Sequence, residues 1–395
     1  MRSCLSLAPI GGLVGHVQNW DPTGSANGTE IMYIDIAAID QGLKCVATPT
    51  RIKAEHAPSR ARQLVEAGDV LVSTVRPNLN AVARVPESLA GATASTGFCV
   101  LRPKPGDLDS DYLFHWVRTP QFVGEMVRRA TGASYPAVSD GIVKESLLPF
   151  PPLPEQQRIA AILDKADAIR RKRQETIALT EELLRSTFLE MFGDPVTNPK
   201  GWPVESLGSH LTFVTSGSRG WARHYRPAGT RFIRSFDVQM NRVSNVDAVF
   251  VDPPGGAEAE RTRVQAGDVL LTITGSRIGR VAPVDDLVGE AFVSQHVAIL
   301  RPAPSLRPRF LSMFLSEPRG GQHQISRMQY GQTKPGLNLD QVRSFRLPFP
   351  PIEAQDRFCH FWTRLEGVLS RSLKASNESD VLFNSLVQHA FRGEL

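Results

Sequence analysis

Apolar positions along this chain follow two different periods. In most of the sequence, short β-branched runs stand between Gly, Pro, Asn and Asp residues, which is the pattern of strands joined by turns. The clearest strands are predicted at 70–75 and 269–274, each after a Gly-Asp pair, and others at 33–36, 98–101, 232–236 and 296–300. Helical apolar spacing predicts helices at 112–118, 121–129 and 310–315. These stretches therefore form α+β blocks with irregular β-sheet cores.

Two long segments have a helical period instead. Residues 155–192 contain neither Pro nor Gly, and their predicted coiled-coil-like seam consists of Ile159, Ile162, Ala166, Ile169, Thr176, Thr180 and Leu183. Segment 353–391 carries a similar stripe: Phe358, Trp362, Leu365, Leu369, Leu382 and Leu386. Its Ser376-Asn-Glu-Ser379 stretch leaves the continuity of this helix open. Because one apolar stripe needs a cover, we predict that the two helices pair. The alternative is that each folds back on its own β block.

The sequence also repeats itself at a constant spacing. Val65-Glu-Ala-Gly-Asp-Val-Leu71 corresponds to Val264-Gln-Ala-Gly-Asp-Val-Leu270, 199 positions later. The same offset relates Leu148-Pro-Phe-Pro-Pro152 to Leu347-Pro-Phe-Pro-Pro351. Solenoid repeats are only about 20–50 residues long, so this period indicates a duplicated domain pair.

The repeat predicts a linear order of segments. Residues 1–150 and 194–349 form two similar α+β domains, and residues 151–193 and 350–395 form two long antiparallel helices between them. Such an arrangement has approximate two-fold symmetry. Duplex DNA also has a two-fold axis, so the chain could present two reading domains to one duplex.

Composition restricts the class of protein. The 395 residues carry a net charge of +5, which permits a nucleic-acid partner without requiring one. No apolar run reaches the roughly 18 residues of a membrane span, and the first 15 residues make a poor signal peptide. The four cysteines are widely spaced, which fits a reducing cytoplasm better than a disulfide framework or a zinc site.

Positive charge gathers in one segment of the second half. No acidic residue stands between Glu205 and Asp237, whereas five arginines do. Arginine can neutralise phosphates and pair with guanine, so we expect DNA contacts here. The expected contacts are Arg219, Trp221, Arg223, His224 and Arg226. A solvated basic loop, or arginines that distant carboxylates neutralise, is the alternative.

Strand-exit loops offer further candidates for base recognition. The loop after 70–75 carries Arg76, Asn78 and Asn80, and its counterpart carries Ser276, Arg277 and Arg280. A third pair of loops lies at equal repeat positions with different side chains: Ser134 and Tyr135 in one copy, Gln332, Thr333 and Lys334 in the other. That pattern is expected where a scaffold is kept and its recognition changes. The basic run Arg170-Arg-Lys-Arg173 is expected to be a solvated helix face, with DNA contact as the alternative.

Motifs of catalysis are missing from the sequence. Asp252-Pro-Pro-Gly255 resembles the Asp-Pro-Pro-aromatic motif of amino-methyltransferases, but Gly255 cannot stack on a base and no Gly-rich cofactor turn accompanies it. The sequence contains no Glu/Asp-x-Lys pair of a nuclease, no phosphate-binding GxxxxGK[ST] loop and no HExxH pair. We therefore predict a binding protein without an active site of its own.

One motif carries a family resemblance. Leu148-Pro-Phe-Pro-Pro-Leu-Pro-Glu-Gln-Gln-Arg-Ile-Ala-Ala-Ile-Leu163, with the helix that ends at Met191-Phe-Gly-Asp-Pro195, resembles the central conserved region of specificity subunits of type I restriction-modification systems. Residues 347–357 with Phe391-Arg-Gly-Glu-Leu395 are similar to the distal conserved region. There, Glu353-Ala-Gln-Asp356 departs from the Pro-Glu-Gln-Gln of the first copy.

The resemblance implies a division of labour. Each recognition domain would read one half of a split, asymmetric DNA sequence, and the helices would set the spacing and dock two modification subunits. Those subunits would bind S-adenosylmethionine and methylate a flipped adenine, and motor-nuclease subunits could join them. This chain would need no cofactor and no metal. Two other functions stay open: a stand-alone DNA methyltransferase, and an adaptor that binds protein rather than DNA.

Overall fold

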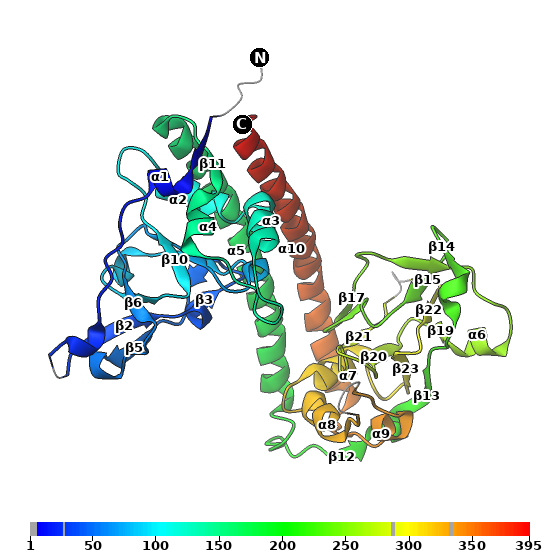
Figure 1. The fold of residues 1–395 in the computed structure, drawn as a ribbon. Coiled ribbons are helices and arrows are strands. Elements are labelled where there is room, and N and C mark those ends of the chain that lie inside the picture. The colour runs from blue at the N-terminus through cyan, green and yellow to red at the C-terminus, as the bar shows by residue number, and fades with distance from the viewer. Residues whose placement is uncertain (1–5, 27, 286–288, 332–334) are drawn as a thin grey trace. The chain divides into compact units, whose positions relative to one another are not determined.

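The computed structural model describes residues 6–26, 28–285, 289–331 and 335–395. They fold into two compact units. The first unit takes in the chain up to Glu175 and the C-terminal Leu373–Leu395, and the second is Thr176–Ser372 (Figure 1). Each unit thus contains one α+β region and part of each of the two long helices, α5 (Leu153–Phe192) and α10 (Ile352–Arg392).

The α+β region of the first unit is built from short, mostly antiparallel strands. Its strand orders are β1-β11, β5-β2-β9-β6, β10-β7-β8 and β3-β4. The strands are β1 Leu7–Pro9, β2 Glu30–Ile34, β3 Ile39–Asp40, β4 Cys45–Val46, β5 Thr50–Lys53, β6 Ala61–Leu64, β7 Val70–Ser73, β8 Val82–Arg84, β9 Thr93–Ser95, β10 Phe98–Leu101 and β11 Leu147–Pro149. The helices are α1 Ile10–Leu13, α2 Ser110–Trp116, α3 Pro120–Arg129 and α4 Asp140–Glu145.

The second unit repeats this plan. Its strand orders are β12-β24, β14-β18-β15-β22-β19, β13-β23-β20-β21 and β16-β17. The strands are β12 Val204–Ser206, β13 Leu211–Ser216, β14 Tyr225–Arg226, β15 Thr230–Ile233, β16 Val238–Gln239, β17 Arg242–Val243, β18 Val249–Val251, β19 Arg263–Val264, β20 Val269–Thr272, β21 Val281–Pro283, β22 Ala291–Val293, β23 Val297–Pro302 and β24 Arg346–Pro348. The helices are α6 Ala257–Arg261, α7 Pro308–Ser316, α8 Gly321–Met328 and α9 Leu339–Arg343. The predicted α+β class and the duplication are confirmed.

A buried ion pair occupies the same position in both units. Asp69 precedes β7 and receives two hydrogen bonds from Arg102, at 2.9 and 2.7 Å. Asp268 precedes β20 and receives two from Arg301, at 2.7 and 2.9 Å. Both carboxylates are almost completely buried. The repeated Ala-Gly-Asp motif therefore forms a turn in each unit. Its aspartate anchors the end of the neighbouring strand, β10 in the first unit and β23 in the second.

The start of each long helix is anchored by one buried glutamine. The Gln156 side chain accepts a hydrogen bond from the Asp109 amide and donates to the carbonyls of Asp107 and Pro151. Gln355 makes the same set with the Arg307 amide and the Ser305 and Pro350 carbonyls. The second motif, Glu353-Ala-Gln-Asp356, keeps this glutamine. Its other positions can therefore differ from the Pro-Glu-Gln-Gln of the first motif.

In the first unit, α5 and α10 run antiparallel and side by side. Ile159 and Leu163 of α5 share a core with Phe383, Val387 and Ala390 of α10. The same core contains Tyr112 and Trp116 of α2, whose rings each lie 5.1 Å from the Phe391 ring. The predicted pairing is confirmed, and the alternative holds in part, because the paired helices also pack on their own α+β region.

The second unit pairs the remaining parts of the two helices through aromatic rings. Phe188 and Phe192 of α5 lie 5.3 and 5.7 Å from the Phe358 ring of α10, and both also contact Phe310 of α7. The helix α10 is continuous through Ser376 and Ser379, both of which are buried. Their small side chains leave room for Arg173 of α5, which donates to the Ala375 carbonyl and the Ser379 hydroxyl in the first unit.

The predicted seam was partly wrong. Ile169 and Leu183 of α5 and Leu382 of α10 are about half exposed. The positions that face inward on α5 include Asp167, which is buried, and Arg170 and Arg173, which are half-buried. The basic run 170–173 is therefore not a purely solvated face, since Arg170 and Arg171 both bind Asp167. No helix in the described part of the chain is long and apolar enough to cross a membrane.

Candidate nucleic-acid interface

In the first unit, two of the predicted recognition loops form one tip. Strand β7 is buried along its length and leads into Val75, which forms a β-bridge with Ala137. The Arg76 amide donates to the Pro136 carbonyl at 2.7 Å. Arg76 adopts a left-handed backbone, with φ of 50°, before the short 3-10 turn Pro77–Leu79. The strand-exit loop and the loop at 131–137 are thus held together by backbone hydrogen bonds.

The tip of the first unit presents a guanidinium on an aromatic ring. The Arg76 Cζ lies 4.7 Å from the centre of the Tyr135 ring, and 68% of Tyr135 is exposed. Asn78 and Ser134 are exposed nearby in the two loops. Stacking on a ring holds an arginine in a defined orientation while its N–H groups stay available for hydrogen bonds. Arg76 and Tyr135 therefore present polar and aromatic groups at one point of the tip.

Asn80 does not fit the predicted role. It is half-buried, its carbonyl accepts a 2.6 Å hydrogen bond from Lys44 Nζ, and its side-chain Nδ2 lies 3.5 Å from the Arg118 carbonyl. Its φ of 46° is one that asparagine tolerates better than most residues. The backbone of Asn80 therefore closes the loop, and the contact of its half-buried side chain with DNA stays a prediction.

The second unit builds its tip on the same backbone with other side chains. Thr274 forms a β-bridge with Gly336, and the Gly275 amide donates to the Pro335 carbonyl at 2.9 Å. The Arg277 Cζ lies 4.4 Å from the centre of the Phe236 ring. Ser276 is exposed and Arg280 half-buried beside it. Gln332, Thr333 and Lys334 lie outside the described residues.

Phe236 is a candidate that sequence reasoning missed. Residues 232–236 were predicted to be one strand, but β15 ends at Ile233. There the Asp237 carboxylate accepts from the Arg234 amide at 2.8 Å and closes a turn, and Phe236 is left 61% exposed. An aspartate that follows an aromatic residue at a strand end was the available signal for this turn.

The basic segment between Glu205 and Asp237 divides into two groups. Arg231 and Arg234 belong to the fold, because Asp237 lies 3.8 Å from Arg231 and accepts hydrogen bonds from Arg234 at 3.2 Å. For these two, the alternative of neutralised arginines is correct. Trp221 is also structural: it is buried, and its ring stacks on Phe232 at 5.3 Å. Its predicted contact with DNA is therefore corrected.

The other three arginines of this segment are exposed. Arg219 precedes the 3-10 turn Trp221–His224, and Arg223 within it donates to the half-buried His224 ring at 3.0 Å. Arg226 on β14 has its nearest carboxylate, Asp252, 4.0 Å away. In the first unit, by contrast, Arg51, Lys53 and Arg62 face Glu30, Glu55 and Asp21 at 3.2, 3.9 and 3.2 Å. Exposed positive charge is thus concentrated on this segment of the second unit, although Arg60 of the first unit is exposed as well.

Comparison with known proteins identifies the duplicated region. The family described as the type I restriction modification DNA specificity domain matches residues 59–180 and 255–378, more than half of the chain. Two curated relatives are similar over parts of this chain. The type I restriction enzyme MjaIX specificity subunit of Methanocaldococcus jannaschii is 28% identical over 36% of this chain and 36% of the relative. The EcoBI specificity subunit of Escherichia coli is 23% identical over 75% of this chain and 68% of the relative.

Solved structures agree on the fold. A chain from a study of complex assembly and conformational transition in the type I R-M system is 26% identical, with a TM-score of 0.53, and the match covers 100% of this chain and 99% of that one. The type I restriction-modification S subunit from M. genitalium has a TM-score of 0.61 at 13% identity, over 99% and 97% of the two chains. With its two matched domains, the chain belongs to the family of the type I restriction modification DNA specificity domain.

Proposed function

We propose that this chain is the DNA-recognition subunit of a type I restriction-modification complex. The observation that carries the proposal is the tip found in both units, where an arginine stacks on an exposed aromatic ring. Arginine pairs bidentately with the O6 and N7 of guanine, and asparagine suits the N6 and N7 of adenine. Arg76 and Asn78 in one tip and Arg277 in the other therefore supply groups for direct base recognition.

The two tips would read different bases. The first offers Asn78, Ser134 and Tyr135 around its arginine, and the second offers Ser276, Arg280 and Phe236. We therefore assign the recognition domains to residues 1–150 and 194–349, with the helical segments 151–193 and 350–395 as the elements that separate two half-sites. A target of two unlike halves follows from two unlike tips.

The exposed arginines of the second unit would contact the DNA backbone. Arg219, Arg223 and Arg226 stand on one short segment, and charge on such a surface positions a duplex without reading its sequence. Their neighbour Trp221 holds the segment on the core through Phe232 and Phe292. The segment can therefore offer its cations from a fixed scaffold.

The long helices would dock the modification subunits. Apolar side chains stay exposed on them: Ile169, Val381 and Leu382 in the first unit, and Leu179, Leu183 and Val368 in the second. Exposed apolar residues gathered on a surface mark protein contacts. One set in each unit would fit two modification subunits, which would carry S-adenosylmethionine, and motor-nuclease subunits could join that assembly. The chain itself would then supply recognition without catalysis.

The deciding experiment compares the methylation pattern of host DNA with and without this chain. Loss of methylation at one bipartite motif on deletion is the expected result. Unchanged methylation would count against the proposal. Saturable binding of S-adenosylmethionine by the purified chain would favour the alternative of a stand-alone methyltransferase. Assembly with partner proteins but no duplex binding in the complete complex would favour an adaptor.

A further inference from the structure

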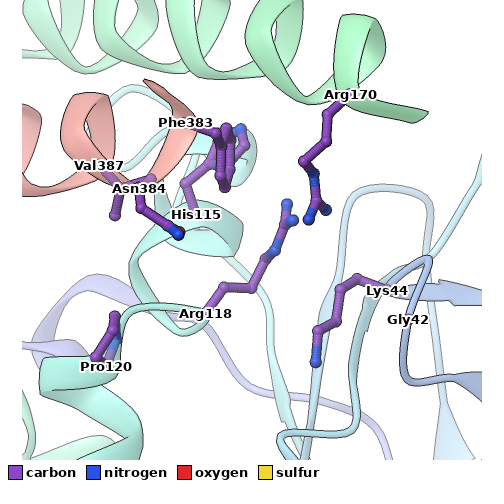
Figure 2. Close-up of a pocket in the computed structure, with 9 residues that line it drawn as sticks. All are labelled: Gly42, Lys44, His115, Arg118, Pro120, Arg170, Phe383, Asn384 and Val387. Carbon is purple, nitrogen blue, oxygen red and sulfur yellow. The ribbon is translucent and has the colours of Figure 1, made fainter. Parts of the chain in front are cut away.

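A cavity of about 180 Å³ lies in the first unit, where its α+β region meets the paired helices (Figure 2). At about 30 Å³ per water molecule, it has room for several waters or for one small anion. Three cations line it from three separate elements: Lys44 from the turn between β3 and β4, Arg118 after α2, and Arg170 on α5. The guanidinium groups of Arg118 and Arg170 point toward one another, with Lys44 beside Arg118.

The carboxylates around the cavity all have partners of their own. Asp167 faces Arg118 at 3.4 Å and is shared with Arg170 and Arg171, both at 2.8 Å. Asp380 lies 3.6 Å from Arg170. Two other carboxylates are held elsewhere, since Asp40 accepts from the Gly42 and Leu43 amides and Asp164 bonds to His115.

The surroundings of the lysine disfavour its charged form. Burial, together with the charges of Arg118 and Arg170, lowers the pKa of Lys44 to about 8, although Asp40 acts in the opposite direction. Lys44 Nζ donates one hydrogen bond, to the Asn80 carbonyl at 2.6 Å, and an ammonium has three N–H groups. Arg118 meets Asp167 only at the long distance of 3.4 Å. The cations can therefore accept a further anionic partner.

The second unit builds a corresponding junction without these three cations. The position 199 residues after Arg118 is Glu317, which is buried and accepts from Arg185 of α5 at 2.7 Å. His115 corresponds to Phe314. Lys44 and Asn241 hold corresponding positions: Lys44 lies just before β4 with a φ of 55°, and Asn241 lies just before β17 with a φ of 59°. Because the second unit folds with a neutral asparagine and an internal Glu–Arg pair, the junction itself does not require three cations.

We propose that this cavity binds one phosphate-like oxyanion, held by Lys44, Arg118 and Arg170. The group could be a free phosphate or sulfate, or a backbone phosphate of DNA; only the second source rests on the proposed function. Lys44 also holds Asn80, the residue that closes the recognition loop after β7. A bound anion would therefore affect the residue that holds the recognition loop of the first unit in place.

Calorimetric titration of the full chain with sulfate at pH 8 tests the free source. Sulfate keeps its two charges at this pH, so any proton taken up belongs to the protein. Lys44, with a pKa of about 8, is about half protonated at this pH, and a bound anion raises its pKa. Binding should therefore take up about half a proton. The binding enthalpies in two buffers of different ionisation enthalpy measure this uptake.

The variant Lys44→Asn should bind sulfate at least tenfold more weakly and without proton uptake. Asparagine tolerates a left-handed backbone, as Asn241 does at the corresponding position, so the fold should be kept. The matched control is Lys165→Gln, which removes an exposed lysine of α5 in the same unit and should bind sulfate like the wild type.

Duplex binding over a range of salt concentrations tests the second source. If the occupant is a DNA phosphate, Lys44→Asn should lower the slope of log affinity against log salt by about 0.9, and Lys165→Gln should leave it unchanged. No saturable sulfate binding together with an unchanged slope would overturn the proposal. Failure of DNA recognition itself would look different, because the wild type would then not bind duplex at all.

Discussion

The two α+β regions of this chain agree in their buried polar contacts and differ in their exposed tips. Asp69–Arg102 and Asp268–Arg301 are the same ion pair, and Gln156 and Gln355 make the same three hydrogen bonds. At the tips, an arginine stacks on a ring in both units. That ring is Tyr135 from the loop before α4 in one unit, and Phe236 from the turn after β15 in the other.

This difference shows which contacts can change after a duplication. A buried carboxylate or amide cannot be replaced alone, because its partners would lose their hydrogen bonds in a place that water does not reach. Side chains at an exposed tip have no such partners. The same stacked arrangement can therefore be rebuilt with an aromatic residue from another part of the chain, and recognition can change while the scaffold is kept.

The largest expected effect tests the shared scaffold. Asp69→Ala and Asp268→Ala each remove the buried carboxylate that binds a partly buried arginine, which should cost up to about 3–5 kcal/mol of unfolding free energy. The loss should be smaller for Asp69→Ala, because Arg102 keeps its ion pair with Glu66. Hydrogen exchange should show the loss mainly in the unit that carries the change. Asp340→Ala, which removes a strongly exposed partner of Arg343, is the control and should have little effect. Equal loss of protection in both units would show that they do not unfold separately.

The next prediction separates the two tips. Arg76→Ala and Arg277→Ala should each relax discrimination at one half of a bipartite target by about 10- to 100-fold, because one bidentate base contact is lost. Methylation of a randomised duplex library by the complex reconstituted with its modification subunits measures this. If either change relaxed both halves together, the assignment of one half-site to each unit would fail. Arg51→Ala, at a surface ion pair with Glu30, should change neither half.

A smaller effect concerns the basic segment, which the first unit does not match. Replacing Arg219, Arg223 and Arg226 together with Ala should weaken duplex binding about equally for all sequences. The salt slope should fall by up to about 2.7, since each phosphate contact contributes about 0.9. Changed base preference with an unchanged slope would instead place these arginines at base edges.

How far the sequence predicts this structure depends on the kind of signal. The long helices follow from the absence of Pro and Gly, and α5 begins at Leu153, within two residues of the predicted start. Apolar spacing failed for the seam, because its middle consists of Asp167, Arg170 and Arg173, which satisfy one another or α10. The spacing of apolar residues cannot predict a helix interface that is made from ion pairs.

The candidate site shows the same limit. Arg76, Asn78 and Arg277 could be found because a loop after a buried strand must reach the surface. Trp221 has suitable chemistry but is enclosed by the fold, and the backbone of Asn80 closes its loop. Phe236 was missed because the turn that Asp237 closes is not visible in the apolar pattern. Residue type indicates what a side chain can bind, whereas only packing decides whether a ligand can reach it.

The smallest expected effect is the pH dependence of stability that Lys44 gives to the first unit and that Asn241 cannot give to the second. The pKa of Lys44 is lowered to about 8 in the folded chain from an ordinary value of 10.5, so between these values the unfolded chain binds more protons. Stability of the first unit should therefore rise as pH increases from about 8 to 10.5. Lys44→Asn should lack this rise and should be more stable than the wild type at pH 7, where the charged lysine is held against Arg118 and Arg170. Hydrogen exchange within the first unit at pH 7 and 9 measures the difference. If the wild type and the variant had the same pH dependence of stability, the pKa of Lys44 would not be lowered in the folded chain. Lys44 and Asn241 would then not differ in their electrostatic effect on stability.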